Sequence, residues 1–159
     1  MQMPTVSNQM KQLTALFSGT WKGEERLHPS DWDPVGGSAS ATWVVRPAVD
    51  GFALLVDYDE SRDGQVVYRG HGVHGWDAGQ GCFFAYWFDN IGMMPAAGNR
   101  ATLDGNRYTY QEAGPMGHSR FTYEWTGDVF TFRIDRSRDG SSWSPMHEGR
   151  YQRQPGTSF

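Results

Sequence analysis

The hydrophobic and polar positions follow a spacing of three and four residues only near the start of the chain. The apolar side chains that recur at this spacing are Met10, Leu13, Leu16 and Phe17. Ser7 precedes them and can cap the first turn, and Gly19 follows them. The pattern therefore predicts one helix over about 7–18, because an amphipathic helix repeats its apolar face every three to four residues.

From Thr20 onward the period becomes two, which is typical of strands. The predicted strands are Thr20–Leu27, Ser38–Val49, Gly51–Ser61, Gln65–Trp76, Gly81–Asp89, Asn99–Asp104, Asn106–Glu112, His118–Thr126, Asp128–Ser137 and Met146–Gln154. Asp-Gly pairs, which suit hairpin turns, stand at 50–51, 63–64, 104–105 and 139–140. We expect an all-β fold, a closed antiparallel up-and-down barrel of about ten strands, because closure removes exposed strand edges.

The lengths of the connections differ between the two ends of this barrel. The connections on one side are 28–37, 61–64, 89–98, 113–117 and 138–145, and nearly all the long ones are among them. The short turns fall on the other side, where the helix also arrives. The pattern predicts one open mouth and one base plugged by the helix. Residues 1–159 would then form a single domain with its barrel over about 20–154.

The sequence is poor in aliphatic residues and rich in aromatic ones. Leu, Ile, Val and Phe make up only 27 of the 159 residues, whereas Phe, Trp and Tyr together contribute 23 and Gly contributes 20. A low aliphatic content with a net charge of only −4 argues against disorder. We therefore expect aromatic side chains to fill much of the barrel.

Several classes of protein are excluded. No apolar run approaches the ~18 residues of a membrane-spanning helix. Residues 1–10 lack the pattern of a secretory signal. The single cysteine, Cys82, cannot form an internal disulfide and fits a cytoplasmic chain. An acidic chain without basic clusters is a poor binder of nucleic acid. We expect neither membrane insertion nor a nucleic-acid partner.

The triplet Gly19-Thr20-Trp21, after a short helix and at the start of the first strand, resembles the G-x-W signature of lipocalin-like (calycin) barrels. In that superfamily the Trp closes the base and an Arg of the last strand often packs over it, a role open to Arg150 or Arg153. The stretches 19–25, 50–52, 70–73 and 148–151 more closely resemble a bacterial lipocalin-like family of unknown function, over nearly the whole chain. The G-T-W-x-G opening is also similar to that of nitrobindin-type haem barrels.

An inward Trp21 places Glu25 inside the barrel near the mouth, because side chains alternate along a strand. A buried carboxylate needs a partner. The candidates are Arg46, Arg69, Arg133 and Arg150. Glu25 would then form either a structural ion pair or a polar anchor for a ligand.

The histidines do not form a metal-binding pattern. His71 and His74 differ by three positions and so point to opposite faces of a regular strand. His71 is expected to line the pocket or to make a structural hydrogen bond.

The segment 83–88, Phe-Phe-Ala-Tyr-Trp-Phe, lacks alternation. Its inner face can line the cavity. Its outer face would expose aromatic side chains to water unless another subunit covered them, so we expect a homodimer interface there. At the mouth, residues 28–34 are expected to form a short lid capped by Ser30.

The leading hypothesis is a non-catalytic barrel that binds a small, mostly hydrophobic molecule in its interior. The expected ligand-binding residues are Trp21, Glu25, Tyr58, His71, Trp87, Tyr123 and Arg133. Among these, Glu25 and Arg133 would orient a polar head group.

Three alternatives remain open. The first, suggested by the nitrobindin resemblance, is haem binding with His147 as the axial ligand and His71 as second choice. The second is an enzyme that uses Glu25, His71 or Asp57 as acid or base, although no nucleophile or phosphate-loop motif is present. The third is a filled structural barrel without a ligand.

Overall fold

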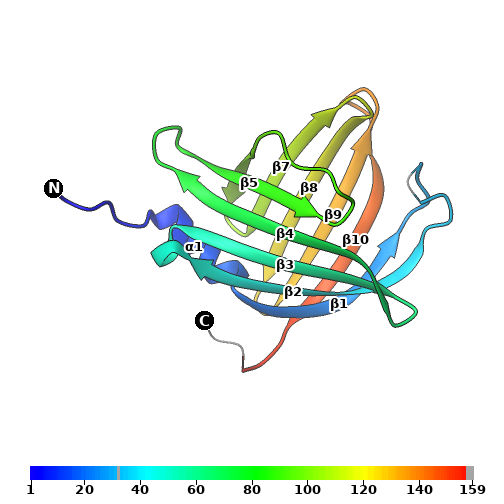
Figure 1. Ribbon diagram of the computed structural model, residues 1–159, viewed down its shortest axis with the longest axis horizontal. Helices are drawn as coiled ribbons and strands as arrows, with labels where there is room; N and C mark the ends of the chain where they lie inside the picture. Colours follow the sequence, from blue (N-terminus) through cyan, green and yellow to red (C-terminus); the bar gives the residue numbers. More distant parts are fainter. Residues whose placement is uncertain (32, 157–159) are drawn as a thin grey trace.

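The computed structural model describes residues 1–31 and 33–156 and folds as a closed barrel of ten antiparallel strands (Figure 1). The elements are α1 (Asn8–Phe17), β1 (Gly19–Leu27), β2 (Gly37–Ala48), a 3-10 turn (Val49–Gly51), β3 (Ala53–Arg62), β4 (Gln65–Asp77), β5 (Cys82–Asp89), β6 (Asn99–Asp104), β7 (Arg107–Gly114), β8 (Gly117–Thr126), β9 (Val129–Ser137) and β10 (Ser144–Arg153). Each strand pairs with its neighbours in the chain, and β1 pairs with β10. The predicted all-β class, strand order and helix are confirmed.

Helix α1 begins as the sequence predicts. The Ser7 side chain accepts a hydrogen bond of 3.1 Å from the backbone N–H of Met10, which satisfies one of the free donors of the first turn. The buried face of the helix consists of Met10, Leu13 and Phe17. Phe17 packs against Trp125 and Phe130 of the barrel, with ring centroids 5.1 and 5.3 Å apart. Residues 1–31 and 33–156 contain no helix long and apolar enough to cross a membrane.

Trp21 closes the base in the way that the resemblance implies. Its indole N–H donates a 2.8 Å hydrogen bond to the carbonyl of Phe17. The guanidinium of Arg153 lies 4.2 Å from the centre of the Trp21 ring and donates to the carbonyls of Ser18 and Leu16. These bonds satisfy carbonyls at the end of α1. Arg150, the other candidate, is exposed.

Aromatic rings fill the base and the middle of the barrel. Trp43 lies among them, with ring centroids 5.2 Å from Phe132, 5.5 Å from Phe130 and 5.5 Å from Tyr151. All four side chains are buried. Such edge-to-face contacts add to the stabilisation from burial alone. Aromatic side chains therefore form much of the hydrophobic core, in place of the few aliphatic ones.

Glycines make room for two of these rings. A Cβ atom built at Gly70 would overlap the ring of Trp87, and one built at Gly149 would overlap the hydroxyl of Tyr151. Both glycines lie within strands, where glycine is otherwise unfavourable. Their positions are explained by the close approach of a large inward side chain.

The pairing between neighbouring strands is shortest between β5 and β6. This strand pairs with β5 only through Phe83–Ala85. Within the described part of the chain, Tyr86–Asp89 form ladder bonds on one side only, to β4. An unpaired strand edge can template pairing with another chain.

Candidate ligand-binding site

The most unusual group inside the barrel is the carboxylate of Glu25, whose side chain has no exposed surface. The hydroxyl of Tyr58 donates to it at 2.6 Å and the hydroxyl of Tyr151 donates at 2.8 Å. Tyr151 comes from β10, which pairs with β1. Tyr58 comes from β3 and reaches past β2, where the inward residues opposite and beside Glu25 are the small Ala39 and Ala41.

Both hydroxyls remain protonated donors. Burial, and next the negative charge of Glu25, raise the pKa of Tyr58 well above its usual value. The same two causes raise the pKa of Tyr151. The three side chains therefore form a hydrogen-bonded unit in which both hydroxyls donate to the carboxylate.

Two further ionisable groups lie next to this unit. The Nε2 atom of His147 is 3.3 Å from a carboxylate oxygen of Glu25. Burial and the charge of Glu25 raise the pKa of Glu60, which faces inward from β3. The closest cation to Glu60 is Arg62, at 3.6 Å, and Arg62 also holds Asp33 at 2.8 Å. The buried group is therefore dominated by carboxylates.

The inward side chains are less completely buried at this end of the barrel. Toward the base, inward side chains such as Trp21 and Phe130 are fully buried, whereas toward the mouth the inward Trp87, Phe121 and Ile134 are only half-buried. Trp87 is held in place because its indole N–H donates to Tyr68 at 2.6 Å. We define the mouth site as Glu25, Tyr58, Glu60, Trp87, Phe132 and His147.

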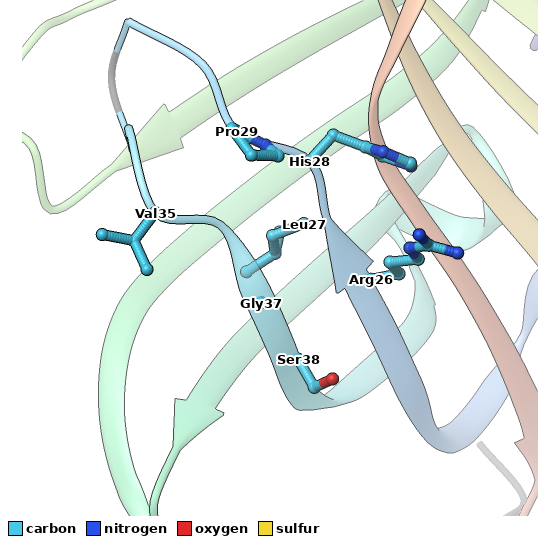
Figure 2. Close-up of a pocket in the computed structure, with 7 residues that line it drawn as sticks. All are labelled: Arg26, Leu27, His28, Pro29, Val35, Gly37 and Ser38. Carbon is cyan, nitrogen blue, oxygen red and sulfur yellow. The ribbon is translucent and has the colours of Figure 1, made fainter.

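A hollow of about 330 Å³ borders the mouth site (Figure 2). Its lining consists of Arg26, Leu27, His28, Pro29, Val35, Gly37 and Ser38. Figure 2 shows that these side chains come from the ends of β1 and β2 and from the loop between them. Leu27 lies opposite His147 in the β1–β10 pair, so the hollow adjoins the mouth site there. A second hollow, of about 370 Å³, lies among outer residues of β8, β9 and β10.

The predicted lid, residues 28–34, is tied down at two points. His28 lies 2.7 Å from Glu148, and Asp33 lies 2.8 Å from Arg62 of β3. The hydrogen bond from Arg62 lowers the pKa of Asp33. The hydroxyl of Ser30 accepts from the backbone of Asp33 and so closes a turn rather than capping a helix. Trp32 lies outside the described residues.

The structure brings some of the expected ligand-binding residues together. Glu25 and Tyr58 are in direct contact, and Trp87 lies 6.1 Å from Tyr58 between ring centroids. Trp21 and Tyr123 also face inward, but both are completely surrounded by side chains of the base and middle of the barrel. Of the seven residues, these last two support the mouth site from below.

The expectation that His71 lines the interior is wrong. Its side chain is 40% exposed on the outside of β4, and its Nδ1 lies 2.8 Å from Asp57. The inward histidine of this strand is His74, whose Nδ1 lies 2.8 Å from the hydroxyl of Tyr108. Burial lowers the pKa of His74 to about 4. Since alternation leaves one histidine on each face, only the orientation of β4 decides between them.

The expectation for Arg133 is also wrong. It lies on the outside of β9, between the inward Phe132 and Ile134, and its Nε donates to Asp135 at 2.8 Å. The predicted partners of Glu25 were Arg46, Arg69, Arg133 and Arg150, and all four are exposed. The actual partners are two tyrosines and His147. Tyr151 could have been found from the sequence, because it lies two residues from Arg153 and thus shares its face of β10.

Haem does not fit the residues present. His147, the predicted axial ligand, points its Nε2 at the carboxylate of Glu25, and the ring of Phe132 packs 5.5 Å from its own. The position that an iron atom would need is therefore taken by a carboxylate. Among residues 1–31 and 33–156, no group of three or more His, Cys, Asp or Glu side chains is arranged to hold a metal ion.

Comparison with known proteins identifies relatives but no activity. The model of a family described as "Protein of unknown function (DUF1579)" matches residues 7–153. No curated protein matches the chain. The crystal structure of Rv2717c from M. tuberculosis is similar, with a TM-score of 0.69 over 94% of this chain and 99% of that one. The two sequences are 13% identical, so this likeness shows the fold alone.

Proposed function

This chain belongs to the DUF1579 family of proteins of unknown function, and we propose that it binds a small, mostly hydrophobic molecule at the mouth site of its barrel. The observation that supports the proposal is a completely buried carboxylate, Glu25, held by Tyr58 and Tyr151 at an end of the barrel where the inward rings are half-exposed. A few placed polar groups among aromatic walls are typical of sites for small molecules.

The ligand occupies the mouth end rather than the depth of the barrel. Below Glu25, the rings of Trp43, Phe130 and Tyr151 are in mutual contact and completely buried. A molecule that entered there would have to displace packed rings. At the mouth, by contrast, the inward side chains of Trp87, Phe121 and Ile134 are only half-buried, so a molecule can contact them without displacing the packed rings of the base.

Acid–base catalysis is not part of the proposal. Two of the three residues considered for that role, His71 and Asp57, pair with each other on the outer surface of the barrel, on the far side of the wall formed by β3 and β4. The third, Glu25, lies in the mouth site, where it accepts hydrogen bonds from Tyr58 and Tyr151.

Native mass spectrometry of freshly purified protein, followed by denaturing mass spectrometry, tests the proposal. We expect an added mass that disappears on unfolding, and we expect the neutral probe 2-naphthylmethanol to raise the melting temperature. Trp87→Leu should weaken both effects, whereas Arg133→Gln, on the outer wall, should leave them unchanged. If neither the added mass nor the thermal shift occurs, the barrel is a filled structural one. An absorption band of haem in the same sample would contradict the proposed ligand.

A further inference from the structure

We propose that the mouth site selects molecules whose polar head group is a protonated amine. This inference rests on the proposed function, since it specifies the ligand of that same site. It follows from the balance of charge, from two unpartnered polar atoms and from the aromatic walls.

The charge inside the mouth site is negative. The side chains of Glu25 and Glu60 are 0% and 10% exposed. Arg62 lies at 3.6 Å from Glu60, but its shorter contact, at 2.8 Å, is to Asp33 of the loop. Among the ion pairs of the described residues, Glu25 is paired with the imidazole of His147, at 3.3 Å, and not with an arginine. A cation brought by a ligand would therefore meet two carboxyl groups beside one imidazole and one guanidinium that is shared with Asp33.

Two buried polar atoms in this group lack a hydrogen-bond partner within residues 1–31 and 33–156. They are Oε1 of Glu60, which lies 3.6 Å from Arg62, and Nε2 of His147, which lies 3.3 Å from Glu25. Glu25 pairs with Ala39 of β2 and Glu60 pairs with Ala41, so the two carboxyl groups face inward from the strands on either side of β2. A buried acceptor without a donor is costly. An ammonium group carries three donors and no acceptor, which suits carboxylate oxygens.

The walls around these carboxylates are faces and edges of rings. The ring centroids of Tyr68 and Trp87 lie 5.8 and 6.1 Å from that of Tyr58. Aromatic faces attract cations, most strongly where water is excluded. The same surroundings disfavour an anionic head group, which would be buried beside Glu25 and Glu60.

Three probes with the same naphthalene body separate the possibilities: 2-naphthylmethylamine, 2-naphthylmethanol and 2-naphthoate. Calorimetric titration at neutral pH should show the amine binding about tenfold or more tightly than the alcohol, with the carboxylate weakest. Glu60→Gln, which keeps the size of the side chain, should remove most of the amine's advantage over the alcohol. Arg133→Gln is the matched outer-wall control and should bind all three as the native protein does.

The outcomes distinguish the two proposals. Equal binding of amine and alcohol would overturn the selection for amines and leave the proposed function standing. Binding of none of the probes would overturn both. An amine preference that survives Glu60→Gln and also Glu25→Gln would place the cation elsewhere and overturn this inference. The comparison of probes on the native protein stands even if one variant fails to fold.

Discussion

The free energy of unfolding should fall on acidification because of His74, and substitution of this residue should abolish most of that fall. Its imidazole is completely buried beneath the ring of Phe17, and burial lowers its pKa from 6.5 to about 4. In the unfolded chain the same side chain is exposed to water and titrates near 6.5. Between these two values the unfolded state binds a proton that the folded state excludes, so stability is present above pH 6.5 and falls as the pH decreases toward 4.

The size of the effect follows from the two pKa values. The lowered pKa corresponds to about 3 kcal/mol when fully developed, and most of this is lost between pH 7 and pH 4. Roughly 2 kcal/mol should already be lost by pH 5, where few carboxylates have titrated. For a domain of ordinary stability, this is a large fraction of the total.

Urea unfolding followed by tryptophan fluorescence at pH 7, 6, 5 and 4 measures the loss. His74→Gln keeps a neutral polar group near the hydroxyl of Tyr108 but cannot take up a proton in this range, so its stability should fall by about 3 kcal/mol less than that of the native protein. His71→Gln, on the exposed face of the same strand, is the control and should follow the native curve. Parallel curves for the native protein and His74→Gln would refute the reasoning, because they would mean that His74 titrates alike in both states.

Three further predictions concern packing and assembly. Gly70→Ala should destabilise by about 1–3 kcal/mol in chemical unfolding, because the new methyl group overlaps a packed indole, whereas Gly114→Ala, with open space around it, should be nearly neutral. Arg153→Ala should cost about 1–3 kcal/mol through loss of its bonds to the end of α1, and an equal cost for the exposed Arg150→Ala would contradict this role. We also propose that the outer face and the free edge of residues 83–88 form a homodimer interface. Light scattering at high micromolar concentration should then give twice the mass of the chain, and the mass of a monomer would contradict the proposal.

The helix and the strands could be predicted because their signals are local. Ser7 and the apolar positions that follow it determine where α1 begins, whatever the rest of the chain does. The Asp-Gly pairs at 50–51 and 63–64 occupy turns in which both residues have positive φ angles, as hairpin connections require. The order of strands then follows from short connections, which leave antiparallel pairing of neighbours as the simple arrangement.

The faces of later strands could not be predicted in the same way. Trp21 sets the orientation of β1 directly, and Glu25 is inward as expected. β4 has no such anchor, and its register to β3 shifts at an irregularity after Glu60. A shift of one residue moves every side chain of a strand to the other face. Periodicity alone therefore does not show which of His71 and His74 faces inward.

The sequence by itself thus determined a ten-stranded barrel with an aromatic interior, a base closed by Trp21 and a carboxylate at position 25 that faces inward. Only the tertiary structure decided what that carboxylate meets. Its three partners come from two other strands, β3 and β10, at sequence distances of 33, 122 and 126 residues. They meet because closure brings β10 beside β1 and because small residues on β2 let Tyr58 reach across. Periodicity records which way a side chain points, whereas the contacts of a buried charge depend on register, bulges and the size of every side chain between.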